Sequence, residues 1–308
     1  MSTVQFGLYP DQLDFNAGDL SVSTLDGLKQ KVDDVMQSGL VERDWCYAPS
    51  AASKDFLSGK VRTLPYTSRI FGLPQTHVLR HANASDPEHL RFLVWMLGFI
   101  EGIRLSDTEA GFLDATPIRP GTLHDIVWLG DSDRRALVIS DEFWRRHAAN
   151  PRIAKGLTGI IHSLFLSQTP TLLDFEEFTY LYIALDGCYF VWSVINGTSK
   201  GYVPHRQRIA TLCGAFHCPV PSWADAQSGT VAAQRNETLH EGLFFDEPLG
   251  YTVYGGSART AASSPYPSAL LHMRCLVCRL ICAIVGFNDA SYISSPIDTR
   301  QPHSVRLP

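Results

Sequence analysis

The sequence predicts an α+β protein, in which a mixed α/β N-terminal region is followed by an all-α helical bundle. In the first half, short apolar runs alternate with Gly, Pro, Asp and Ser, a pattern typical of short strands between turns. In the second half, longer segments repeat apolar residues at helical spacing. The chain has 308 residues, which is enough for two domains. We therefore expect a mixed α/β domain at 1–150, a helical bundle at 151–290 and a C-terminal tail at 291–308.

The elements expected in the N-terminal half are mostly short. Apolar runs bounded by turn residues predict strands. These runs are 4–8, 61–64, 126–129 and 136–139. One longer helix is predicted at 87–103, where Asp86 can cap the first turn. A second, shorter helix is predicted at 141–150.

Helices dominate the expected C-terminal half. The predicted helices are 152–168, 174–196, 204–216, 230–242 and 268–287. The helix at 174–196 begins with three acidic residues, which suit the positive end of a helix dipole. It is then apolar on nearly all sides, so we expect it at the centre of the bundle. The segment 247–267 is rich in Gly, Ser, Ala and Pro and is predicted to be a loop.

Several features of the sequence predict a cytoplasmic protein. The most apolar late stretch, 267–287, is interrupted by His272, Arg274 and Arg279, whereas a membrane span needs about 20 apolar residues. The first residues lack the basic start and apolar core of a signal peptide. The seven cysteines are an odd number, which argues against a framework of disulfides. We therefore expect reduced thiols and no membrane partner.

The distribution of charge bears on a nucleic-acid partner. The net charge of −5 argues against a protein that coats nucleic acid without specificity. However, residues 198–308 contain nine Lys plus Arg and seven Asp plus Glu, which gives them a net charge of +2 and leaves −7 for the remainder. The charge of the C-terminal part is therefore compatible with RNA binding. We expect such binding to use a few residues that contact phosphate rather than a broad basic surface.

Three cysteines on one predicted helix resemble a metal cluster at first sight. They are Cys275, Cys278 and Cys282. Their helix is apolar, and the sequence contains no second ligand pair with zinc-site spacing. Buried thiols that pack as small apolar residues are the commoner alternative. The sequence also lacks phosphate-binding loops and GxSxG motifs, so we expect no metal and no cofactor.

Asp186 is an unusual residue for its position. It lies in the middle of the apolar helix 174–196, among residues that we expect to be buried. Buried carboxylates are rare unless they are paired. Two interpretations follow: a structural hydrogen bond within the bundle, or a pair in which Asp186 orients a cationic residue of a functional site.

A second polar group lies on the predicted helix 230–242. Arg235 and His240 form an Arg-x4-His pattern, and Asn236 shares a helix face with His240 because four positions separate them. The bare pattern is weak, since Arg119 and His124 match it by chance in a loop broken by Pro and Gly. The helical setting favours the first match.

These residues resemble a known family. The segment RNETLHEG, with Arg235, Asn236 and His240, resembles the RNxxxH motif of the HEPN domain, a helical bundle of prokaryotic RNases and of toxin or defence proteins. The preceding segments FEEFTYLYIALDGCYFVW, HRQRIATL and VPSW resemble its Apea-like branch. The resemblance covers roughly residues 151–290. Upstream, RIFGLPQTH, GFLDATPIRPG and ALVISDEFW resemble an N-terminal region of uncharacterised bacterial proteins, which implies no function.

The resemblance implies a metal-independent endoribonuclease that works as a homodimer, with two motifs in one cleft. His240 would be the general base or acid for attack of the RNA 2′-hydroxyl on the adjacent phosphate. Arg235 would hold that phosphate, and Asn236 would position the phosphate or the ring of His240. We add Asp186 as a polar partner from the neighbouring helix. We also expect Arg206 and Arg208 to contribute to RNA binding.

Two other hypotheses are compatible with the sequence. The bundle could be a non-catalytic HEPN-like module for dimerisation or regulation, with a ligand or regulatory partner at the N-terminal domain. A weaker hypothesis places a small-molecule enzyme site around Arg69, His77 and Asp114, although their spacing matches no known motif.

Overall fold

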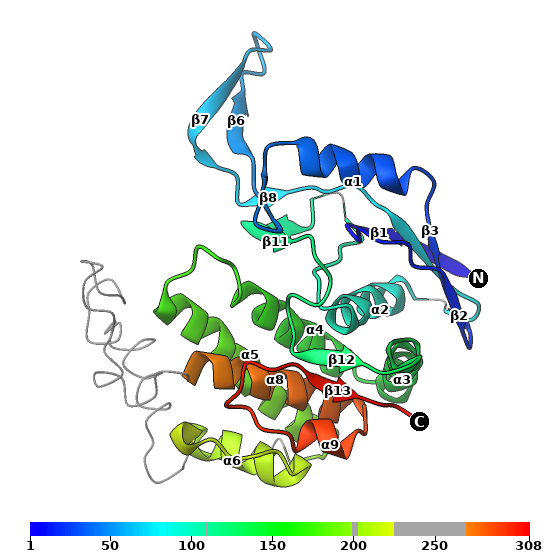
Figure 1. Ribbon diagram of the computed structural model, residues 1–308, viewed down its shortest axis with the longest axis vertical. Helices are drawn as coiled ribbons and strands as arrows, with labels where there is room; N and C mark the ends of the chain where they lie inside the picture. The colour runs from blue at the N-terminus through cyan, green and yellow to red at the C-terminus, as the bar shows by residue number, and fades with distance from the viewer. Residues whose placement is uncertain (85, 109, 199–202, 225–268) are drawn as a thin grey trace. The chain divides into compact units, whose positions relative to one another are not determined.

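The chain is an α+β protein made of two compact units, Met1–Leu123 and His124–Pro308. The computed structural model describes residues 1–84, 86–108, 110–198, 203–224 and 269–308 (Figure 1). The division between the units falls after residue 123, not at the expected residue 150. The helix α3 (Ser132–His147) belongs to the second unit because it packs against helices α4 and α8 of that unit.

A four-stranded antiparallel sheet forms the base of the N-terminal unit. Its strands are β1 (Ser2–Phe6), β9 (His77–His81), β3 (Leu20–Thr24) and β2 (Phe15–Ala17), in that order. In the register, Leu79 lies opposite both Val4 and Val22. Helix α2 (Pro87–Ile100) packs against β1 and β9. The expected cap of this helix is confirmed, since the carboxylate of Asp86 accepts a hydrogen bond from the backbone N–H of Glu88 at 2.9 Å.

Smaller elements complete the N-terminal unit. They are α1 (Leu28–Gln37), the sheet β11 (Ala115–Pro117), β5 (Trp45–Tyr47) and β4 (Val41–Glu42), the pair β10 (Phe112–Leu113) and β8 (Ile70–Phe71), and the hairpin β6 (Ser50–Lys54) and β7 (Val61–Thr67). A second small core lies among α1, β5, β8 and β10 and includes Val35, Cys46, Phe71 and Phe112.

Helices make up most of the described C-terminal unit. They are α3, α4 (Pro151–Leu166), α5 (Asp174–Ile195), α6 (His205–Phe216), the short 3-10 helix η1 (Ser222–Ala224), α8 (Ala269–Val285) and α9 (Ala290–Ile293). The unit is not all-helical, because β12 (Ile126–Trp128) pairs in parallel with β13 (His303–Val305). The expected tail at 291–308 therefore contributes a strand and most of a helix to this unit.

The strand predicted at 136–139 is wrong. These residues lie inside α3, which also absorbs most of the short helix expected at 141–150. The buried residues of α3 include Ala136, Leu137, Ser140 and Phe143, and the intervals of three and four residues among them place one face of a helix against the unit's core. The four apolar residues from 136 to 139 were too short a window to distinguish a strand from a helix.

Helix α5 is central, as expected, and packs against α4, α6 and α8. It is long and apolar enough to cross a membrane, but half of that window is buried in the protein, and core helices commonly meet the same criterion. Two glycines bring α4 and α5 close together. A Cβ on Gly187 would lie 2.8 Å from Ile160 Cγ1, and one on Gly156 would lie 2.6 Å from Val191 Cγ2. Larger side chains at these positions would push the two helices apart.

A buried arginine joins three segments of the C-terminal unit. The side chain of Arg279 on α8 is fully buried, and its guanidinium donates to Asp125 Oδ2 at 2.8 Å. It also donates to the hydroxyl and carbonyl of Ser295 and to the carbonyls of Pro296 and Cys275. Tyr292 lies against the guanidinium and donates its hydroxyl to Asp125 Oδ1 at 2.8 Å. The network therefore ties α8 to the residues after α9 and to the residue preceding β12.

We expect Arg279→Met to lower the free energy of unfolding by about 3–5 kcal/mol, because the largely buried carboxylate of Asp125 would lose its charged partner. Denaturant unfolding of the full chain measures this loss. Arg274→Met is the matched control on the same helix, since Arg274 is only partly buried and donates to Gln168, and it should cost about 1 kcal/mol or less. Equal losses for the two variants would contradict the prediction.

His77 is buried in the sheet of the N-terminal unit. Its ring stacks on Phe6 with centroids 5.6 Å apart and meets the edge of Tyr9 at 5.5 Å. Its nitrogens lie within hydrogen-bonding distance of the hydroxyls of Thr76 and Thr24. Burial lowers the pKa of His77 to about 4. His77 is therefore a neutral core residue, and the hypothesis that groups it with Arg69 and Asp114 is disfavoured.

The lowered pKa of His77 predicts acid destabilisation. In the unfolded chain the pKa of His77 is about 6.5. Between about pH 6.5 and 4, the unfolded state therefore binds more protons than the folded state. The stability that neutral His77 provides is complete above pH 6.5 and is lost as the pH falls towards 4, by up to about 3 kcal/mol. Urea unfolding at several pH values measures the slope, which His77→Gln should reduce. An unchanged slope in that variant would rule the explanation out.

Candidate functional site

The motif that carries the family resemblance lies outside the described residues. This applies to Arg235, Asn236 and His240 and to the whole predicted helix 230–242. The other three expected site residues are described, and they lie on two adjacent helices of the C-terminal unit. Asp186 is on α5, and Arg206 and Arg208 are on α6.

Asp186 and Arg208 form an ion pair between these two helices. Arg208 Nη1 donates to Asp186 Oδ1 at 2.5 Å. The guanidinium also donates through Nε to the carbonyl of Val203 at 3.1 Å and lies 5.1 Å from the ring centroid of Tyr189. Asp186 thus has a cationic partner, which agrees with both interpretations of this residue, and its predicted role beside Arg235 and His240 stays a prediction. It is less buried than expected, since its side chain is 35% exposed.

His205 is a third member of this cluster. Its Nδ1 lies 3.5 Å from Asp186 Oδ1 and 3.2 Å from the hydroxyl of Tyr182, whose ring stacks on the imidazole. Tyr182, Asp186 and Tyr189 are separated by four and three positions along α5, so they share the helix face that packs on α6. We call Tyr182, Asp186, Tyr189, His205 and Arg208 the α5–α6 polar cluster.

The first turn of α6 is unusually basic. His205, Arg206 and Arg208 all lie within it, where the helix dipole is positive and cations are unfavourable. Asp186 compensates part of this charge from α5. Arg206 is exposed and lies outside the α5–α6 polar cluster. Together, the dipole and these side chains create a positive local potential suited to an anion.

The cysteines of the C-terminal unit behave as core residues. The six are Cys188, Cys213, Cys218, Cys275, Cys278 and Cys282, and all are buried. Burial raises the pKa of Cys213 to about 12 and that of Cys218 and Cys275 to about 11. It also raises the pKa of the other three. This burial agrees with the interpretation that these thiols pack as small apolar residues.

Trp223 lies in η1, after α6, and does not offer an exposed ring to a ligand. In the structure it is 1% exposed, and its Nε1 donates to His272 Nδ1 at 3.4 Å. It is therefore a core residue.

Two polar groupings were missed from the sequence. His205 was not singled out, although it stands directly beside Arg206 in the segment HRQR. The spacing of Tyr182, Asp186 and Tyr189 would have identified the face of α5 that it meets. The contact of Asp125 with Arg279 joins residues far apart in the chain, and only the presence of an arginine in an apolar helix pointed to it.

Comparisons with known proteins identify no relative. No protein-family model, curated protein or solved structure matches the chain.

We expect Asp186→Asn to lower the free energy of unfolding by about 1 kcal/mol, because it removes the charge that holds Arg208 and His205. The effect is smaller than for a buried pair, since the cluster is partly exposed. Urea unfolding at low and high salt measures it, and the loss should shrink in high salt. Arg206→Ala is the control and should stay within about 0.5 kcal/mol of the wild type. Equal effects would contradict the assigned pairing.

Proposed function

We propose that this chain is a metal-independent endoribonuclease of the HEPN type. The observation that carries the proposal is the RNETLH segment, in which Arg235, Asn236 and His240 stand at the spacing of the RNxxxH motif within a predicted helix. The RNA 2′-hydroxyl would be the nucleophile, so DNA would not be a substrate.

The chemistry assigns a role to each motif residue. His240 takes the proton from the 2′-hydroxyl, whose oxygen then bonds to the adjacent phosphorus while the bond to the 5′-oxygen breaks. The 5′-oxygen leaves as a hydroxyl after it receives a proton. Arg235 stabilises the charge that develops on the phosphate by forked hydrogen bonds, and Asn236 orients the phosphate or the imidazole. The products are a 2′,3′-cyclic phosphate and a 5′-hydroxyl.

The α5–α6 polar cluster supports this proposal. It lies on two helices of the same unit, and its basic turn offers a second contact for the RNA backbone. Arg206, which is exposed, would bind a neighbouring phosphate. Arg208 and His205 would be held in position by Asp186 rather than act on the scissile bond.

The wider assignment follows from the same resemblance. We infer a cytoplasmic protein that cleaves RNA as a homodimer, in a toxin or antiviral defence role. The N-terminal unit would regulate cleavage through a ligand or partner.

One observation favours a non-catalytic alternative. Arg208 already contacts Asp186, the carbonyl of Val203 and Tyr189, which is the arrangement of a residue that stabilises a helix interface. If Arg235 and His240 are engaged in the same way, the unit would be a HEPN-like module for dimerisation or regulation.

We expect the purified chain to cleave RNA in the presence of EDTA, and to leave 2′,3′-cyclic phosphate ends. An Arg235→Ala/His240→Ala variant should lose at least about 100-fold in rate, because it lacks both the general base and the phosphate grip. Gel analysis of an RNA and of the same RNA with one 2′-deoxy nucleotide at the cleavage site measures both effects. The deoxy substrate should resist cleavage at that site.

Arg119→Ala is the matched control, since Arg119 belongs to the second, chance match of the same pattern. It should cleave at the wild-type rate. Cleavage that persists in the double variant, or that occurs equally at a 2′-deoxy position, would refute the ribonuclease. No cleavage by any variant, combined with intact dimerisation, would favour the non-catalytic module.

A further inference from the structure

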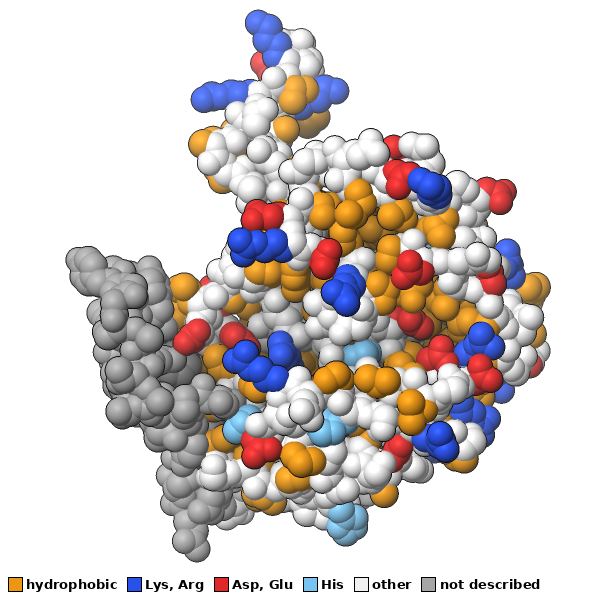
Figure 2. Space-filling view, viewed as in Figure 1, with side chains coloured by type: hydrophobic (Ala, Val, Ile, Leu, Met, Phe, Trp, Pro, Cys, Tyr) orange, Lys and Arg blue, Asp and Glu red, His pale blue; other side chains and the backbone are white. Residues whose placement is uncertain are grey.

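The hairpin β6–β7 projects from the N-terminal unit and carries an apolar tip (Figure 1). Phe56 is 94% exposed and Leu57 is fully exposed. Figure 2 shows hydrophobic side chains beside Lys and Arg side chains on this arm. The cations are Lys54, Lys60 and Arg62. Two large apolar side chains at the end of an arm indicate a surface that is covered by a partner.

The tip has a defined conformation. The carboxylate of Asp55 accepts hydrogen bonds from the backbone N–H groups of Leu57 at 2.8 Å and Ser58 at 3.2 Å. The backbone of Asp55 is also bonded to Gly59 and Lys60. The backbone of Phe56 and Leu57 is thus held in an ordered turn, so little backbone freedom remains to be lost when they bind.

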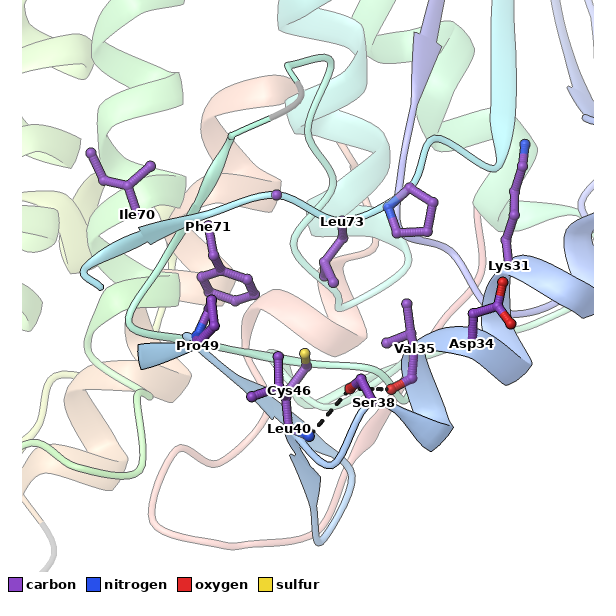
Figure 3. A pocket seen from close by; sticks show the side chains of 12 residues that line it. Lys31, Asp34, Val35, Ser38, Leu40, Cys46, Pro49, Ile70, Phe71 and Leu73 are labelled. Carbon is purple, nitrogen blue, oxygen red and sulfur yellow. Dashed lines mark hydrogen bonds between the residues drawn. The ribbon is translucent and has the colours of Figure 1, made fainter. Parts of the chain in front are cut away.

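A cavity lies near the other end of the same hairpin. Its volume is about 370 Å³, and its lining includes Pro49, which precedes β6. Figure 3 shows Phe71 of β8 and Leu73, which follows this strand, on one side of the cavity, and Val35 of α1 and Cys46 of β5 on the other. The floor is buried, whereas Asp34 and Ser38 on the rim are exposed.

The tip and the cavity are complementary in size and in charge. An apolar cavity of about 150 Å³ holds a benzene molecule, so one more than twice as large can hold a phenyl and an isobutyl side chain together. The tip is flanked by cations, and the rim carries the carboxylate of Asp34. The other rim charge, Lys31, donates to the carbonyl of Gln75 at 2.9 Å.

We propose that two copies of this chain exchange their β6–β7 arms, so that Phe56 and Leu57 of one copy fill the cavity of the other. The tip and the cavity lie near opposite ends of one hairpin, so a two-fold axis allows the two arms to run antiparallel and both contacts to form at once. The seven residues of β7 span about 23 Å, which sets the separation of the two contacts. This interface involves only the N-terminal unit and does not depend on ribonuclease activity.

The first test is the oligomeric state of the full chain, measured by sedimentation velocity over a wide range of concentration. The wild type should associate, and Phe56→Asp/Leu57→Asp should weaken the contact between the arms by at least about tenfold, because two apolar contacts per arm are lost. The separate bundle contact of the proposed function would be unchanged in this variant. Both residues are exposed, so the variant should fold. Val220→Asp, which alters an exposed apolar residue of the other unit, is the control and should leave the dimer intact.

The second test locates the tip. A chain with Leu57→Cys is mixed with a chain with Ser38→Cys under mild oxidation, and a disulfide between the two chains is expected. Cross-linking of Leu57→Cys only with itself would indicate tip-to-tip pairing and overturn the proposal. It would also be overturned by a monomeric wild type, or by a cross-link between Leu57→Cys and Ser38→Cys that persists at full yield when Phe56→Asp is added to the first chain. A dimer that survives in the double Asp variant after this cross-link is lost is the bundle dimer of the proposed function. Binding of the monomer to phosphatidylserine vesicles, lost in that variant, would assign the tip to lipid instead.

Discussion

The buried ion pair of Arg279 and Asp125 is the constraint on which much of the C-terminal unit depends. A guanidinium with no exposure to water is tolerated only if its charge and its donors are satisfied. Here Asp125, Ser295, Pro296 and the carbonyl of Cys275 meet that demand. These groups come from separate parts of the chain. The charge of Arg279 on α8 therefore fixes the positions of the segment that begins the unit, at Asp125, and of the segment that follows α9.

The parts of the fold that local physics determines were predictable. The boundaries of α2 and α5 follow from Asp86, from the acidic first turn of α5 and from runs of apolar residues. The residues 136–139 were misassigned because a short apolar run fits either periodicity. The pairing of β12 with β13, and with it the boundary between the units, depends on contacts between distant residues, which local patterns do not encode.

The candidate site divides in the same way. Asp186 stood out because a carboxylate within an apolar helix needs a partner, and the structure supplies Arg208 and His205. The identity of those partners follows from the packing of α5 on α6 and not from the sequence pattern. The carboxylate of Asp186 thus neutralises part of the positive charge at the first turn of α6. For the proposed RNA binding, this leaves a positive patch of limited extent, which would contact a few phosphates and would be sensitive to salt.

The parallel pairing of β12 and β13 has a consequence for synthesis in the cell. The strand at 126–128 emerges from the ribosome long before the strand at 303–305. Asp125 is likewise synthesised before Arg279 and Tyr292, with which it later forms hydrogen bonds. The N-terminal unit can fold while translation continues, but the C-terminal unit cannot reach its final packing until the last strand is free of the exit tunnel.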